Sequence, residues 1–195
     1  MKRTKAAQSE ATTGRLLAVA REHFTRDGYA AAATERIVAE AGVTRGALYH
    51  HFGNKLGLYR GVLEQVHAEV GQRVEAAAMT EQDPWQALQA GCRAFLEVAA
   101  DADVQRIMLL DAPAVLGWAE WRAMDARHSM RHLQEQLELL AQEGYLHPLD
   151  TEALAYMLSG AMNEATLWIA TQENPQRALQ KAADSLHRLL AGLAV

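Results

Sequence analysis

The sequence predicts an all-α protein with about nine helices. Apolar residues recur at the three- and four-residue spacing of amphipathic helices along most of the 195-residue chain. Residues that typically begin and end helices follow one another at helical intervals, and no stretch alternates β-branched with polar residues as a half-buried strand does. The chain contains only four prolines. We therefore expect a helical protein without a sheet.

Three short helices are expected at the front of the chain. The first has Leu16, Leu17, Ala20 and Phe24 on its inner face. Polar capping residues and following glycines bound these helices, which run from about Ser9 or Thr13 to Asp27, from about Thr34 to Ala41, and from Thr44 to near His51. The second and third form a candidate helix-turn-helix at about residues 33–52.

Longer helices are expected in the rest of the chain. Asp83, Pro84 and Gln86 have the order of an N-cap, a first helical residue and a capping-box partner. Pro113 and Gly117 are expected to interrupt the region after Leu110. The expected rear helices run from Asn54 to about Ala78, from Asp83, from Trp118 to Glu143, from Asp150 to about Gln172, and from Asn174-Pro175 onward.

Charge divides the chain into a basic front and an acidic rear. Residues 1–60 hold ten Lys/Arg and five Asp/Glu, a balance of +5, whereas residues 61–195 hold nine and nineteen, a balance of −10. This asymmetry favours a polyanion partner for the front alone, although chance clustering gives the same count. We expect two domains with these bounds.

Other bulk properties point to a cytoplasmic protein. No apolar run reaches the roughly 20 residues of a membrane helix, and the basic N-terminus is not followed by a secretory apolar stretch. Cys92 is the only cysteine, which excludes an internal disulfide and suits a reducing compartment. The arm of Lys2, Arg3 and Lys5 is either a minor-groove contact or a solvated tail.

The third helix carries the most specific surface. Helical periodicity places Arg45, Gly46, Tyr49 and His50 within an arc of about 140°, while Leu48 lies at its edge and anchors the helix. Arginine makes bidentate contacts with guanine or phosphate, glycine permits close backbone approach, and tyrosine and histidine donate to phosphates or bases. The alternative is a structural three-helix bundle with an incidental basic face.

Residues 13–63 resemble the DNA-binding region of the TetR family of bacterial transcriptional regulators. The matching elements are Arg15-Leu16-Leu17, Phe24, Gly28-Tyr29, Ile37, Ala41-Gly42-Val43, Gly46 to Phe52, Lys55 and Leu58. The resemblance implies that the third helix reads DNA, with Arg45, Gly46, Tyr49 and His50 facing the duplex. It also implies a phosphate contact by Lys55. Thr44 is expected to cap this helix at the DNA surface.

Two features depart from the family pattern. The family places Ser or Thr just before the second helix, where this chain has Ala32 and Ala33, so we assign the capping and phosphate-contact role to Thr34. The family also favours acidic residues after the fourth-helix lysine. This chain has Leu56 and Gly57 there, which predicts a looser first turn.

The rear domain is a candidate ligand-binding and dimerisation domain. All four tryptophans and every internal methionine follow residue 78, and such side chains suit an adaptable apolar pocket, with ordinary core packing as the alternative. The resemblance implies that a pocket exists. Its candidate residues are Trp85, Cys92, Phe95, Met108, Asp111, Trp118, Trp121, Met124, His128, Asn163 and Trp168.

The last two expected helices each carry a long apolar stripe. Two copies of this pair form a four-helix interface with two-fold symmetry, whereas the alternative directs both stripes into the monomer core. The dimer is favoured mainly by the resemblance. The candidate interface residues are Met157, Ala161, Ala165, Leu179, Ala183, Leu186 and Leu190.

These observations predict a homodimeric regulator that binds a palindromic operator in double-stranded DNA and is released by a mostly apolar small molecule. Repression is favoured over activation, which the residues alone do not exclude. We expect neither a cofactor nor a metal, because His128 and His132 share a helix face without a completing Cys or carboxylate. The alternatives are a protein-interaction module and a small helical enzyme. No catalytic constellation supports the enzyme.

Overall fold

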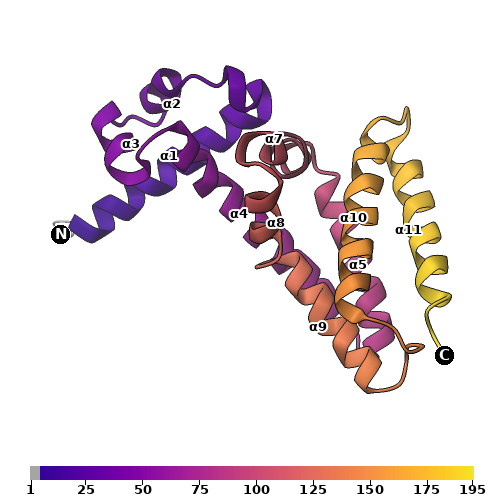
Figure 1. The fold of residues 1–195 in the computed structure, drawn as a ribbon. Coiled ribbons are helices and arrows are strands. Elements are labelled where there is room, and N and C mark those ends of the chain that lie inside the picture. Colours follow the sequence, from indigo (N-terminus) through magenta and orange to yellow (C-terminus); the bar gives the residue numbers. More distant parts are fainter. Residues whose placement is uncertain (1–4) are drawn as a thin grey trace.

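The computed structural model describes residues 5–195 and confirms the all-α fold class within that range (Figure 1). Its one β-type contact there is an isolated bridge between Leu146 and Ala194. Lys2 and Arg3 of the basic arm lie outside the described residues, as does the side chain of Lys5. None of the described helices is both long and apolar enough to cross a bilayer.

The front module consists of α1 (Lys5–Ala31), α2 (Thr34–Glu40) and α3 (Arg45–Phe52). Its core contains the predicted inner residues Leu16, Phe24, Ile37 and Leu48, each at most 1% exposed. α1 begins earlier than its sequence predicts. Its regular part ends at Gly28 as predicted, because Gly28 has a non-helical φ of 75°, which suits glycine, and a short helical piece up to Ala31 follows this kink.

A single long helix joins this module to the rest of the chain. α4 (Lys55–Ala78) begins where predicted, and the Asn54 side chain accepts a 2.8 Å hydrogen bond from the Gly57 backbone N–H. Figure 1 shows α4 running from beside α3 deep into the rear domain. Buried residues follow one another along it from Leu58 to Val74. One rigid element therefore contacts both parts of the protein.

Four further helices build the rear domain around α4. α5 (Pro84–Ala99), α9 (Ser129–Gln142) and α10 (Thr151–Ala170) pack against one another, and α5 and α9 also pack on α4. α11 (Pro175–Ala191) packs on α5 and α10 and lies at the outer edge in Figure 1. The predicted N-caps at Asp83, Asp150 and Asn174 are confirmed, because each side chain accepts a 2.9 Å bond from the backbone three residues later.

The segment after Asp101 is helical where an interruption at Pro113 is predicted. α6 (Ala102–Val104), the π-helix η1 (Gln105–Asp111) and α7 (Ala112–Leu116) follow without a gap. Pro113 is the second residue of α7 and lies directly after the change from the π-helix to the α-helix. The predicted break at Gly117 is confirmed, since its φ is 81°. The predicted interruption at Pro113 is wrong, because the backbone of Asp111 and Ala112 just before it stays in the α-helical region.

The predicted helix from Trp118 to Glu143 is two helices. α8 (Trp118–Asp125) ends in a tight turn, and α9 starts after His128, whose φ and ψ are −122° and −113°. No proline or glycine marks this break. Tertiary contacts accompany it: the His128 ring stacks on His67 of α4, and its Nε2 lies 2.8 Å from Glu64 Oε1. Periodicity alone therefore overestimates this helix.

Candidate nucleic-acid interface and cavity

The outward face of α3 consists of the side chains expected to read DNA. Leu48 is 1% exposed and fixes the inner face of the helix, so that Arg45, Gly46, Tyr49 and His50 lie at the surface. Thr44 caps α3 as predicted, since its Oγ1 accepts a 3.2 Å bond from the Ala47 N–H. This arrangement exposes a short basic and aromatic helix face at one end of the molecule.

Arg45 is aligned along that face by its neighbours. Its Nη2 donates to the Tyr49 hydroxyl at 3.2 Å, its guanidinium lies 5.4 Å from the centre of the Tyr49 ring, and Nη1 is 3.6 Å from Glu35 Oε1. The hydrogen bond to Tyr49 is the main cause that raises the pKa of Arg45. Arg45 therefore stays cationic while remaining open to a new partner.

Thr34 does not cap α2, which corrects the role assigned to its hydroxyl. The N-cap is Ala33, which offers no side-chain bond, and Thr34 is the first helical residue. Its Oγ1 instead donates to Glu35 Oε2 at 3.2 Å. A hydroxyl caps from the residue before the helix, not from its first residue. A phosphate contact by Thr34 remains a prediction without capping to support it.

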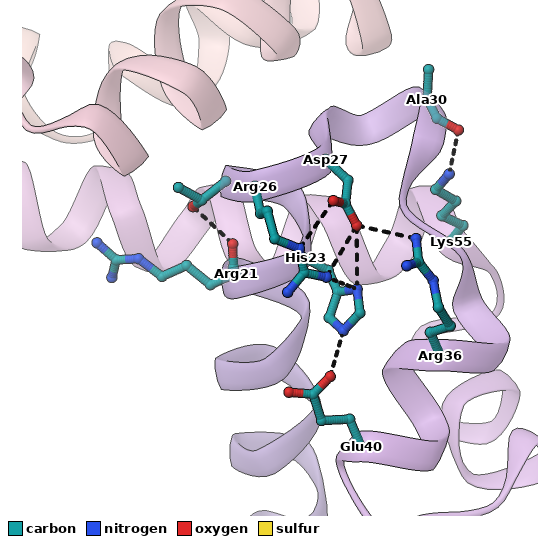
Figure 2. Close-up of polar contacts among 9 residues, drawn as sticks. Arg21, His23, Arg26, Asp27, Ala30, Arg36, Glu40 and Lys55 are labelled. Carbon is teal, nitrogen blue, oxygen red and sulfur yellow. Dashed lines mark hydrogen bonds and ion pairs between the residues drawn. The ribbon is translucent and has the colours of Figure 1, made fainter.

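Lys55 is half-buried at the start of α4 instead of fully extended into solvent. Its Nζ donates to the Ala30 carbonyl oxygen at 3.1 Å and lies 4.7 Å from the centre of the Tyr29 ring (Figure 2 shows the first contact). Burial lowers the pKa of Lys55. An ammonium group has three N–H donors, so two remain for a phosphate after the bond to Ala30.

Gly57 lets the first turn of α4 pack closely against the end of α3, while a looser first turn stays a prediction. A Cβ at this position would overlap the carbonyl oxygen of Phe52, the last residue of α3. The missing acidic residues are offset by the cap from Asn54. Glycine at this position permits the close approach of the two helices.

Sequence reasoning missed a buried histidine that ties α1 to α2. His23 is 1% exposed; its Nε2 lies 2.8 Å from Glu40 Oε2, and its Nδ1 lies 3.0 Å from Arg26 Nη2 (Figure 2). Arg36 of α2 reaches back to Asp27 at 3.2 Å. These bonds hold the helix-turn-helix on α1, and the position of His23 beside core residue Phe24 was the available signal.

The front module is also bonded to the segment around η1. The Tyr29 N–H donates to Asp111 Oδ2 at 2.8 Å, and Arg21 lies 2.6 Å from an oxygen of Asp103. Tyr59 on α4 contributes a further contact in the same region. Charge counting along the sequence does not reveal these contacts, because the partners are about 80 residues apart.

A cavity of about 450 Å³ lies in the rear domain between α4, α5, α9 and α10. Its volume falls within the range of small-molecule sites, roughly 300–1,000 Å³. Apolar side chains form much of its wall, and three glutamates, two serines, two glutamines and a histidine are the principal polar ones. The residues that carry the later argument are Glu75, Glu81, Ser129, Glu135, Gln136 and Ser159.

Two protein-family models match this chain, one over the front module and one over the rear domain. Residues 16–62 match the family model described as bacterial regulatory proteins, tetR family, and residues 85–193 match that of the tetracyclin repressor-like C-terminal domain. The second match alone spans more than half of the chain. The chain belongs to the TetR family. It is therefore a helix-turn-helix transcriptional regulator.

Three relatives illustrate this TetR-family membership. The crystal structure of a TetR-family transcriptional regulator from Pectobacterium atrosepticum is 41% identical, with a TM-score of 0.79 over 99% of this chain and 98% of that one. The Transposon Tn10 TetC protein of Escherichia coli is 27% identical over 72% of this chain and 71% of its own length. The repressor BepR of Brucella suis is 31% identical over 55% of this chain and 52% of its own.

Two of the predicted pocket residues of this TetR-family chain line the cavity. Cys92 and Phe95, both on α5, belong to its wall. Burial raises the pKa of the Cys92 thiol to about 12. Because only the thiolate is nucleophilic, Cys92 serves as an apolar part of the cavity wall. His132, which shares a helix face with His128, also lines the cavity. The described residues contain no group of three potential ligands suited to a metal ion.

The other pocket candidates lie elsewhere. Trp121 is buried and donates its indole N–H to the Met108 carbonyl at 2.8 Å, so both residues belong to the packed core. Trp118 is 67% exposed. The residues outside this cavity are Trp85, Met108, Asp111, Trp118, Trp121, Met124, His128, Asn163 and Trp168. Met108, Trp121 and Met124 are buried in the core, whereas Trp118 and Trp168 are exposed.

The dimer candidates divide into exposed and buried sets. Met157 is 71% exposed, and Ala161 and Ala165 line a shallow groove between α10 and α11 together with Trp168. Leu186 and Leu190 are 8% and 1% exposed within a single chain, because they face the monomer core. Both are therefore corrected to core residues. Leu179 and Ala183 are half-buried on the same helix.

Proposed function

We propose that this chain is a dimeric repressor that binds a roughly palindromic operator and is released by a small molecule in the α4–α5–α9–α10 cavity. Each subunit inserts α3 into the major groove of one half-site. The observation that carries the proposal is the exposed face of Arg45, Gly46, Tyr49 and His50 on a helix anchored by Leu48. A dimer matches the two-fold symmetry of such an operator.

The groups on this face have distinct roles in the proposal. Arg45 makes bidentate contact with guanine or pairs with a phosphate, and its bond to Tyr49 directs both side chains outward together. Lys55 and the hydroxyl of Thr44 lie beside helix N-termini, where phosphate oxygens are favoured. Gly46 brings the backbone close to the duplex.

α4 and η1 connect the cavity to this face. The far end of α4 supplies Val74, Glu75, Ala78 and Met79 to the cavity wall, while its first turn packs against α3 at Gly57. η1 contacts α1 and α4 and is also linked to α10, where Gln105 donates to the Thr166 carbonyl at 3.2 Å. A ligand that displaces α4 or α10 therefore changes the position of α3.

Release follows if the ligand binds more tightly to a dimer whose two α3 helices no longer match both half-sites. A ligand shifts the equilibrium only by its difference in affinity for the two states, typically about 1–3 kcal/mol of coupling. The exposed residues of α10, including Met157 and Ala161, face the second subunit in this proposal. The reducing cytoplasm, where operator DNA lies, is the expected compartment.

Selection of bound fragments from genomic DNA tests the proposal. The purified chain is mixed with sheared DNA, bound fragments are sequenced, and the enriched sequence is placed in a labelled duplex. We expect a palindromic consensus bound by a dimer and released by a compound from a ligand screen. The absence of an enriched sequence, or binding by a monomer to a single half-site, would contradict the proposal. Genes beside the enriched sites then guide the choice of ligands.

A further inference from the structure

The wall of the α4–α5–α9–α10 cavity carries three carboxylates, and two of them have no basic partner. Glu75, Glu81 and Glu135 line it, whereas none of its described lining residues is a lysine or an arginine. Glu75 and Glu81 are exposed at the cavity and form no ion pair with any other residue in the described range 5–195. Apolar side chains from α5 and α9 form the complementary surface for an apolar ligand body.

The arginines that contact lining residues already have acidic partners. Arg122 donates to Asp125 Oδ2 at 2.7 Å and to Ser159 Oγ at 3.1 Å. Arg131 donates to Glu135 Oε1 at 3.2 Å. A carboxylate ligand would share these guanidinium groups with the acidic partners that they already have, and it would lie near the remaining glutamates. The cavity is therefore unfavourable for an anion.

The two serine hydroxyls in the cavity wall already donate hydrogen bonds to another side chain of the protein. Ser129 Oγ donates to Asp125 Oδ1 at 3.2 Å, and Ser159 Oγ lies 3.4 Å from Asp125 Oδ2. Asp125 is 3% exposed. Its neutral hydrogen-bond donors are these two hydroxyls. A hydroxyl has one proton, and with that proton committed it can only accept from a ligand. Gln136 uses one of its two amide N–H donors on the Pro84 carbonyl at 2.7 Å.

From the acidic wall, the paired arginines and the committed serine protons, we infer that the effector is an apolar molecule carrying a cationic amine, and that the cavity discriminates against carboxylates of the same shape. The inference rests on the proposed function, because it specifies the ligand of the site proposed above for the effector. The amine lies near Glu75 and Glu81 and donates to hydroxyl or amide oxygens, while its apolar body packs against Leu88, Phe95 and neighbouring side chains.

Three probes with one body and different head groups test this inference. 4-Phenylbutylamine, 4-phenylbutanol and 4-phenylbutanoate are titrated calorimetrically into the full chain without DNA, at about pH 8. We expect the amine to bind on the order of tenfold more tightly than the carboxylate, with the alcohol between them. Equal or tighter binding of the carboxylate, or no saturable binding of the amine, overturns the inference.

Variants locate the effect in the cavity. The double variant Glu75→Gln and Glu81→Gln should reduce the affinity for the amine several-fold and leave that for the alcohol unchanged. Glu143→Gln removes an exposed carboxylate that does not line the cavity and serves as the matched control. An unchanged amine affinity in the double variant also overturns the inference.

A separate measurement distinguishes this inference from the proposed function. The amine is added to the complex of the chain with its selected operator, and DNA release is followed by fluorescence anisotropy. Selective amine binding with release supports both. Selective amine binding without release supports the ligand class and contradicts the effector role. Release by the carboxylate alone contradicts the ligand class and supports the effector role.

Discussion

The Tyr59 hydroxyl of α4 donates a 2.7 Å hydrogen bond to the Ile107 carbonyl oxygen of η1. Both residues are fully buried, and this burial raises the pKa of Tyr59. The Tyr59 ring also packs edge-on against Phe24 and Tyr29 of α1. One side chain thus joins the DNA-reading module, the connecting helix and the rear domain.

Removal of this hydroxyl should destabilise the protein. Tyr59→Phe removes one of two donors to the Ile107 carbonyl, which keeps its bond from the Ala112 backbone N–H, so we expect a loss of about 0.5–1.5 kcal/mol in the free energy of unfolding. Urea denaturation followed by circular dichroism measures the change. Tyr156→Phe is the control, since Tyr156 is 49% exposed. Equal stabilities for the two variants would show that the buried bond contributes nothing net.

A methyl group at Gly57 should disturb the junction of α3 and α4. Gly57→Ala places a Cβ against the Phe52 carbonyl oxygen, a backbone atom that moves only if α3 moves. We expect a loss of about 1–3 kcal/mol in unfolding free energy together with weaker operator binding. Gly14→Ala in exposed α1 has no atom within 4 Å of its Cβ and should stabilise slightly. The same sign for both variants would contradict this account of Gly57.

Arg45→Ala should weaken operator binding and relax sequence preference. An arginine that contacts a base edge contributes about 1–3 kcal/mol of discrimination, so the affinity should fall about tenfold or more at fixed salt. Gel-shift titrations with the selected operator and with a scrambled duplex measure both effects. Arg93→Ala, an exposed arginine on α5, should leave them unchanged. Retained affinity and preference in Arg45→Ala would remove this residue from the interface.

His67 should make the stability depend on pH. Burial lowers the pKa of His67 to about 3, from 6.5 for an ordinary histidine, and neither ring nitrogen has a hydrogen-bond partner in the described structure. The groups around it are His128, Glu64 and Arg127. Because the unfolded state binds a proton that the folded state does not, stability is lost as the pH falls below about 6.5, by about 2 kcal/mol at pH 5.

The variant His67→Leu tests this dependence. Leucine has no group to protonate and no nitrogen to leave unpaired, so the variant should lose most of the decline between pH 7 and pH 5. His187→Gln changes an exposed histidine and should retain the decline. Urea midpoints at several pH values measure the effect. An identical pH profile for wild type and His67→Leu would contradict the assignment to His67.

Local signals in the sequence predicted most of the helices and the reading face. The caps at Thr44, Asp83, Asp150 and Asn174 depend on neighbouring residues, and so does the arc from Arg45 to His50. These features could be predicted because helix starts and helix faces are set within one or two turns. The same locality explains why the bounds of α2, α3 and α4 agree with the sequence to about one residue.

Features that depend on distant residues could not be predicted in this way. The break at His128 accompanies contacts with Glu64 and His67, and the position of Lys55 is set by Ala30 across a turn. Met108, Trp121 and Met124 are packed in the core and Trp118 and Trp168 are exposed, because apolar periodicity does not distinguish core, surface and cavity wall. Leu186 and Leu190 were assigned to an interface for the same reason.

The most direct test of the central claim is the affinity of the full chain for its selected operator duplex, measured by fluorescence anisotropy over a range of salt concentrations. If the α3 face and Lys55 contact phosphates and bases, the logarithm of the affinity falls steeply and linearly with the logarithm of salt concentration, by about 0.9 for each phosphate contact. The selected sequence should also be bound more tightly than a scrambled one throughout. Failure to bind either duplex even in dilute buffer would contradict the account.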